Sequence, residues 1–176
     1  MSSRSMSRLG KRANDQRDAG ATPDRDAWTT PSWITDALGA FDLDPCSNVR
    51  ACVQADRAFR LDAGEDGLEL AHTVPADSRV FINPPYSSGQ VIRWVKAYEH
   101  TRFCFLLRFD PSTAWFAHLY RRSGLVVVPR KRVNFQPPPG VKAFTNVYPH
   151  ALFFARASDA SEQINRLSYA WRTRPS

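Results

Sequence analysis

The chain has 176 residues, of which 43% are hydrophobic and 12% aromatic, and a formal net charge of +7. This length suits one domain with a sizeable core and leaves no room for a large second domain. No apolar run approaches the roughly 20 residues of a membrane span, and the amino-terminal residues lack the hydrophobic segment of a signal peptide. The composition therefore argues against a membrane protein and predicts a cytoplasmic one.

The positive charge is concentrated in the second half of the chain. Residues 101–176 contain 12 Lys and Arg against 3 Asp and Glu, whereas residues 1–100 contain 12 against 14. A one-sided basic surface attracts phosphate backbones, although on charge alone a solvated basic face is equally good. Cys46, Cys52 and Cys104 lack the paired spacing of a zinc site and the histidines are scattered, so we predict reduced thiols and no metal.

Residues 1–24 contain almost no bulky apolar side chain and cannot offset the entropy cost of ordering. We expect them to form a disordered basic tail, with residues 25–176 as a single domain. Beyond the tail, Ser32 is placed to cap a short helix over 33–38. The alternation in 41–47 predicts a strand that ends at a Pro-Cys-Ser turn.

The stretch from 48 to 65 is short for a complete helix and strand, and no acidic residue in it clearly ends a second strand. An Asp66-Gly67 pair follows, where glycine allows close approach of the backbone and a plain turn is the alternative. Residues 70–78 are expected to be a connection.

The most informative stretch is the apolar run 80–82, which stops at Asn83-Pro84-Pro85-Tyr86. Because the prolines lack the N–H that a strand needs, the strand ends there and Asn83 is presented on a stiff turn. Residues 90–98 then have helical spacing. A turn in which Asn83 caps that helix is the alternative reading.

This four-residue motif can do specific chemistry. The side-chain oxygen of Asn83 and the carbonyl of Pro84 together can accept both protons of a planar amino group, and Tyr86 offers a face to an aromatic base. The motif therefore favours alkylation of an exocyclic amine.

The sequence beyond residue 98 predicts three strands, two helices and a basic hairpin. The strands are 103–107, 125–129 and 151–155, and Thr113 begins a helix that runs to residue 120. One peripheral helix is expected in 156–176. Around 121–144, arginines and amides gather beside a Pro-Pro-Pro-Gly loop, which is typical of nucleic-acid recognition, although a proline-stiffened loop with solvated arginines is the alternative. The predicted DNA-binding residues are Arg121, Arg122, Arg130, Lys131, Arg132, Asn134 and Gln136.

Several motifs resemble the phage-type, Dam-like DNA adenine amino-methyltransferases, in their order and rough spacing. They are DAWTTPSWITDAL, FDLDPCS, DGL, VFINPPYSS, TAWF and NVYPHALFF, and they span about residues 26–155. Two departures are the absence of a Gly-rich loop and an Arg108-Phe109-Asp110-Pro111 segment where the family usually has Pro-Ala-Arg-Thr-Asp-Thr.

The resemblance implies an α/β, Rossmann-like methyltransferase fold with a compact mixed sheet flanked by helices. It also implies S-adenosylmethionine as cofactor and the N-6 amino group of a flipped-out adenine in double-stranded DNA as substrate. The implied catalytic residues are Asn83, Pro84, Pro85 and Tyr86, and the implied cofactor-binding residues are Thr30, Pro31, Asp44, Pro45, Cys46, Ser47, Asp66 and Asn83. The ribose ligand stays unassigned, and for Asp44 a plain surface carboxylate is the alternative.

Two other functions remain open at this point. One is cytosine amino methylation, which uses similar motifs but commonly has Ser in the first position. The other is a methyltransferase-like DNA-binding protein without activity. The resemblance implies a phage or prophage origin with a role in restriction-modification or regulation, and we expect a monomer or weak dimer.

Overall fold

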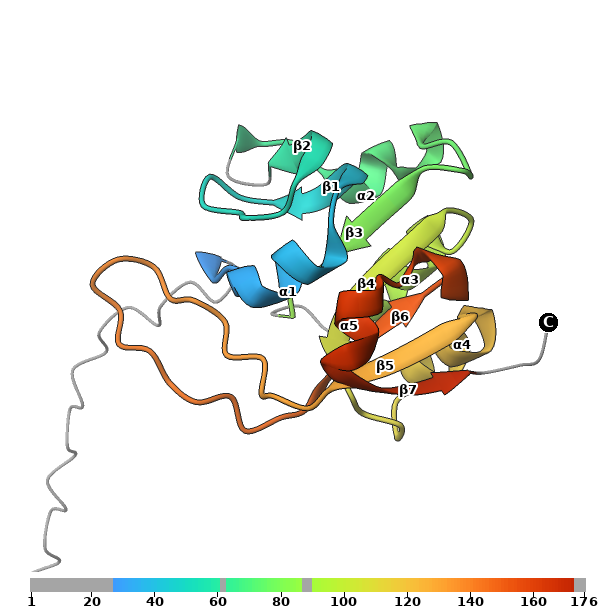
Figure 1. Ribbon diagram of the computed structural model, residues 1–176. Helices are drawn as coiled ribbons and strands as arrows, with labels where there is room; N and C mark the ends of the chain where they lie inside the picture. The colour runs from blue at the N-terminus through green and yellow to red at the C-terminus, as the bar shows by residue number, and fades with distance from the viewer. Residues whose placement is uncertain (1–26, 61–62, 87–89, 173–176) are drawn as a thin grey trace, which may run out of the picture.

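The computed structural model describes residues 27–60, 63–86 and 90–172, without the side chains of residues 170–172. The predicted tail over 1–24 lies outside the described residues. Within them, seven strands form one sheet in the order β2-β1-β3-β4-β6-β5-β7 (Figure 1). The strands are β1 (Phe41–Ser47), β2 (Ala55–Arg60), β3 (Arg79–Ile82), β4 (Arg102–Arg108), β5 (Leu125–Pro129), β6 (His150–Phe154) and β7 (Ser168–Arg172).

The sheet is mixed. Strands β2, β1, β3 and β4 run parallel, whereas β6 pairs antiparallel with both β4 and β5, and β7 pairs antiparallel with β5. Helices flank both faces: α1 (Ser32–Leu38), α2 (Gly67–Leu70), α3 (Val91–Tyr98), α4 (Ala114–Arg122) and α5 (Glu162–Arg166), with short 3₁₀ turns η3 (Ala71–Thr73) and η4 (Ala157–Asp159). This confirms the predicted α/β, Rossmann-like arrangement.

Alternate residues of the central strands enter two separate cores. Val80 and Ile82 of β3 pack in the cluster that includes Trp94 of α3, whereas Phe81 packs in the cluster that includes Ile34 of α1. Figure 1 shows α1 and α5 in front of the sheet and α3 and α4 behind it. Because both faces are covered, the central strands are apolar throughout, as is usual for parallel strands.

The predicted strands 80–82, 103–107, 125–129 and 151–155 are confirmed within one residue at each end, and so is the helix over 90–98. The helix predicted from Thr113 to residue 120 is α4, which ends two residues later, at Arg122. Thr113 caps α4, since its side chain accepts a hydrogen bond from the backbone N–H of Phe116. The single helix expected in 156–176 is α5.

Some boundaries were wrong. Helix α1 starts at Ser32 itself, with Pro31 at the N-cap and no side-chain cap. Strand β1 continues through Pro45 to Ser47 with a register shift against β2. The connection expected over 70–78 begins with the end of α2 and with η3.

Strands β2 and β7 were not predicted. Both lie at the edges of the sheet, and β2 is largely exposed, with charged residues in its middle. Edge strands carry charges that protect them from pairing with other chains, so their sequences lack a clear apolar alternation. Pairing with a neighbouring strand, and not local sequence, makes them strands.

Gly67 is required where α2 packs on β1. A Cβ at this position would lie well inside van der Waals contact of the Pro45 carbonyl oxygen. The carbonyl of Gly67 also accepts a hydrogen bond of 2.6 Å from the buried hydroxyl of Tyr98. The close approach therefore anchors the segment that ends β1.

We expect Gly67→Ala to lower the free energy of unfolding by about 1–3 kcal/mol, because the backbone must shift to relieve the overlap. Gly140→Ala is the comparison: nothing lies within 4 Å of its Cβ position, but φ is +80°, so only the left-handed backbone should cost about 1 kcal/mol. Urea denaturation measures both. Equal losses in the two variants would show that the approach at Pro45 is not close in solution.

None of the helices in the described ranges is long and apolar enough to cross a membrane.

Candidate active site

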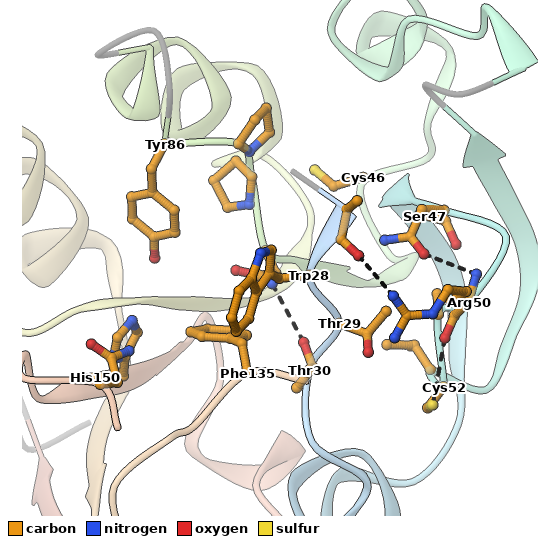
Figure 2. A pocket seen from close by; sticks show the side chains of 18 of the residues that line it. Trp28, Thr29, Thr30, Cys46, Ser47, Arg50, Cys52, Tyr86, Phe135 and His150 are labelled. Carbon is orange, nitrogen blue, oxygen red and sulfur yellow. Dashed lines mark hydrogen bonds between the residues drawn. The ribbon is translucent and has the colours of Figure 1, made fainter. Parts of the chain in front are cut away.

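The carboxyl ends of β1, β3 and β4 meet at one edge of the sheet because these strands are parallel. Ligands of open α/β sheets gather at this edge. Here a cavity of about 970 Å³ opens beside the motif that follows β3 (Figure 2). Its lining includes Trp28, Thr29, Thr30, Asp44, Cys46, Ser47, Arg50, Asn83, Pro84, Pro85, Tyr86, Arg108, Phe135, Tyr148 and His150.

Asn83 stands directly after β3 and is not the N-cap of α3, which is Gln90. Its side-chain nitrogen donates to the hydroxyl of Thr30 at 3.4 Å. Its side-chain oxygen Oδ1 is buried and has no partner among the described residues. A buried acceptor without a partner costs about 1–3 kcal/mol, so a ligand N–H placed there would recover that cost.

Other unpaired polar atoms belong to residues that line the same cavity. In the described ranges, four buried side-chain nitrogen or oxygen atoms have no hydrogen-bond partner, and three of them belong to cavity-lining residues: Trp28 Nε1, Thr29 Oγ1 and Asn83 Oδ1. Native structures leave few such atoms unpaired. Their concentration at one cavity indicates a polar ligand there.

Asp44 lies at the end of β1 with only 3% of its surface exposed, so the surface-carboxylate alternative is wrong. It accepts a hydrogen bond of 3.1 Å from the backbone N–H of Cys46. Burial raises its pKa to about 6, although bonds from Cys46 and Ser47 oppose the rise. A carboxylate that is buried away from water is stabilised by a nearby positive charge, so this position favours a positively charged ligand.

Cys46 is not a reactive thiol. Burial and the neighbouring Asp44 raise its pKa well above the usual value, and a protonated thiol is neither a nucleophile nor a good metal ligand. Within the described ranges, no group of three His, Cys, Asp or Glu could hold a metal ion.

Tyr86 and His150 lie on one side of the cavity, and Cys46, Ser47 and Arg50 on the other (Figure 2). The Tyr86 ring is half-buried, and its hydroxyl donates to the carbonyl of Leu106 at 3.3 Å. Burial, followed by the nearby arginines, lowers the pKa of His150 to about 4. His150 is therefore neutral at physiological pH.

Segments that are far apart in the sequence meet beside the cavity. Thr29 and Gln136 exchange two backbone hydrogen bonds, of 3.1 and 2.9 Å, and the rings of Trp28 and Phe144 lie 4.7 Å apart. Arg50 donates to the carbonyl of Pro137 at 2.8 Å and also to that of Ala27. The loop after β1 thus ties the amino-terminal segment to the loop between β5 and β6.

Not every predicted cofactor residue lines the cavity. Thr30, Asp44, Cys46, Ser47 and Asn83 do, whereas Pro31, Pro45 and Asp66 do not. The side chain of Asp66 accepts from the backbone N–H of Leu68 at 2.8 Å and caps α2. The Asp-Gly pair thus starts a short helix.

The predicted DNA-binding residues fall into two groups. Arg130, Lys131, Arg132, Asn134 and Gln136 are exposed on the long loop 130–149, drawn in orange in Figure 1. Arg121 and Arg122 end α4, and Arg122 pairs with Glu99 at 3.3 Å. Helix α4 leads into the start of β5, and the loop follows the end of β5. Arg121 and Arg122 therefore lie at the edge of the sheet opposite the loop.

The loop joins the antiparallel neighbours β5 and β6, so it is the connection of a β-hairpin. In the described ranges it has no strand ladder, only an isolated bridge between Gln136 and Thr29. Side chains organise it instead: Asn134 accepts from the backbone N–H of Asn146 at 2.9 Å, and Arg132 donates to the carbonyl of Val147 at 2.8 Å. Both side chains therefore shape the loop.

Sequence reasoning gave no site role to Trp28, Arg50, Phe135 or His150 and named Arg108 only in a segment that departs from the family pattern, yet all five line the cavity. Only Arg108 carried a signal, since it follows a buried strand at the edge where ligands bind. Trp28, Arg50 and Phe135 reach the cavity through loop contacts that have no local pattern, and His150 reaches it through the pairing of β6 with β4.

The comparison with family models agrees with this geometry. The family model described as DNA N-6-adenine-methyltransferase (Dam) matches residues 19–172. No curated protein and no solved structure matched the chain. Since the family match covers most of the 176 residues, the chain belongs to the DNA N-6-adenine-methyltransferase (Dam) family.

Proposed function

We propose that the protein transfers the methyl group of S-adenosylmethionine to the N-6 amino group of an adenine that is flipped out of double-stranded DNA. The observation that carries this proposal is the unpaired, buried Oδ1 of Asn83 in the cavity. It is an acceptor with no partner among the described residues. Pro84, the next residue in the chain, also lines the cavity and would supply its backbone carbonyl as a second acceptor. Two such acceptors fit the two protons of an exocyclic amine.

The residues present fit the cofactor. S-adenosylmethionine carries a cationic sulfonium and an ammonium group, and the buried Asp44 carboxylate suits a cation. Thr30, Asp44 and Ser47, which line the cavity, would hold the cofactor, and Tyr86 lies on the side of the cavity opposite Ser47 (Figure 2). When bound, the cofactor supplies the electrophilic methyl group.

The protein's own part is positioning. Adenine stacked in a duplex cannot reach a recessed site, so it must leave the helix at a cost of a few kcal/mol. Tyr86 would stack on the base, and Asn83 with the Pro84 carbonyl would hold the amine with its nitrogen lone pair toward the methyl group. Holding two reactants in line removes much of the barrier. The amine proton then passes to water, with no metal or covalent nucleophile needed.

The test uses purified protein, cofactor labelled in its methyl group and unmodified duplex DNA, followed by digestion to nucleosides. We expect the label in N-6-methyldeoxyadenosine. Label in N-4-methyldeoxycytidine would establish the cytosine alternative instead. Binding of DNA without any label would establish the DNA-binding protein without activity.

A further inference from the structure

Arg108 holds an unusual position at the end of β4, opposite His150 in the β4–β6 register. Its side chain is half-buried and lines the cavity. The guanidinium carbon lies 5.2 Å from the centre of the Tyr86 ring and 4.5 Å from that of Tyr148. Contacts with both rings hold the cation in place through cation–π attraction.

The guanidinium of Arg108 has no carboxylate partner in the described part of the chain. Arginine–carboxylate pairs there involve Arg102, Arg122, Arg156 and Arg166. Asp110, the nearest carboxylate in sequence, accepts instead from the backbone N–H and the hydroxyl of Ser112, at 3.2 and 2.5 Å. Within the described residues, the hydrogen-bond donors of Arg108 are therefore left for a ligand.

The surroundings add no negative charge. His150 is neutral at physiological pH, and the buried Asp44 belongs to the β1 end of the cavity, at Cys46 and Ser47. The Tyr86 side of the cavity thus carries a fixed cation, whereas the β1 side carries the Asp44 carboxylate together with Arg50, which already donates to the carbonyls of Ala27 and Pro137. A planar guanidinium with free N–H groups matches an anionic group with two oxygens, which it binds through two parallel hydrogen bonds.

We propose that Arg108 binds a DNA backbone phosphate that flanks the flipped adenine. This proposal rests on the proposed function and names the group that would hold the nucleotide's backbone while its base lies against Tyr86. Tyr148, the other ring beside the guanidinium, is 52% exposed, so the cation lies near the open side of the cavity, where a strand would pass. The cofactor carboxylate is the other source of a two-oxygen anion.

Duplex binding of Arg108→Gln, measured over a series of salt concentrations, tests the contact. Loss of one phosphate contact should reduce the slope of log Kd against log salt by about 1. Arg108→Lys keeps the charge and should keep most of the slope. Arg156→Gln is the matched control, because it removes an equally positive side chain from an exposed pair with Asp77, and its slope should equal that of the wild type.

A second measurement changes the DNA one phosphate at a time and compares the wild type with Arg108→Gln. Neutral methylphosphonate linkages are placed one at a time on either side of the target adenine. One of them should weaken wild-type binding about tenfold, as expected for a lost charged hydrogen bond, but should hardly change binding by Arg108→Gln. Equal losses in both proteins would overturn the proposal.

Affinity for S-adenosylmethionine, measured by calorimetry, separates the two anions. We expect Arg108→Gln to bind the cofactor as tightly as the wild type. A weaker cofactor affinity with an unchanged salt slope would assign the guanidinium to the cofactor carboxylate and overturn the phosphate contact. Failure of the proposed function looks different, because the wild type would then transfer no methyl group whatever its salt slope.

Discussion

Replacing Asn83 with alanine is expected to lower the rate of methyl transfer by about 10²–10³-fold or more, by analogy with the removal of one preorganised hydrogen-bonding group from other active sites. The variant loses the acceptor that would hold the target amine in line. Single-turnover transfer of labelled methyl groups measures the effect at the chemical step.

The same variant should fold normally. Asn83 makes one long hydrogen bond, to Thr30, and its Oδ1 has no partner in the described structure. Removing an unpaired buried acceptor relieves its desolvation cost, so we expect a free energy of unfolding within about 1 kcal/mol of the wild type. Affinity for the cofactor should also change little.

Asn83→Asp is the matched control, because it keeps the shape of the side chain and an acceptor at Oδ1. It should retain far more activity than Asn83→Ala. Near-normal turnover by the alanine variant would remove Asn83 from the chemistry.

Replacing Asp44 with asparagine is expected to make the protein more stable while weakening cofactor binding. The pKa of Asp44 is raised to about 6, from about 3.9 in an unfolded chain. Folding therefore favours the protonated form, and the charged form costs stability. This cost is absent below about pH 4, grows as pH rises to 6 and is complete above that.

The substitution Asp44→Asn removes this cost, so it should raise the free energy of unfolding by about 1–3 kcal/mol at pH 8 and by almost nothing at pH 4. The amide oxygen can still accept the hydrogen bond from Cys46 that Asp44 accepts. Chemical denaturation at both pH values measures the effect, with Asp56→Asn on exposed β2 as control. A difference independent of pH would contradict the buried charge.

Cofactor binding by Asp44→Asn should show the opposite trend. Loss of the carboxylate should weaken affinity for S-adenosylmethionine about 10–100-fold, the range expected for a charged hydrogen bond. Wild-type affinity should also fall as pH drops through about 6, because the free protein then protonates Asp44. The variant's affinity should lack this pH dependence. Equal affinities at pH 8 would place the cofactor's cationic groups away from Asp44.

The central part of the fold was predictable because local patterns and tertiary packing agree there. The apolar runs of β3, β4, β5 and β6 are buried on both faces, and prolines stop the chain after Asn83. Edge strands β2 and β7 were missed, since their pairing depends on neighbours, and the burial of β2 does not alternate along the strand.

The sequence by itself determined the motif Asn83 to Tyr86, its place after a buried strand, and the family. Only the tertiary structure decided which distant residues join it. Arg108 and His150 meet through the register of β4 with β6, whereas Arg121 and Arg122 are carried to the opposite edge of the sheet by α4. Strand order and loop contacts set these positions, and they depend on long-range packing that no short stretch of sequence encodes.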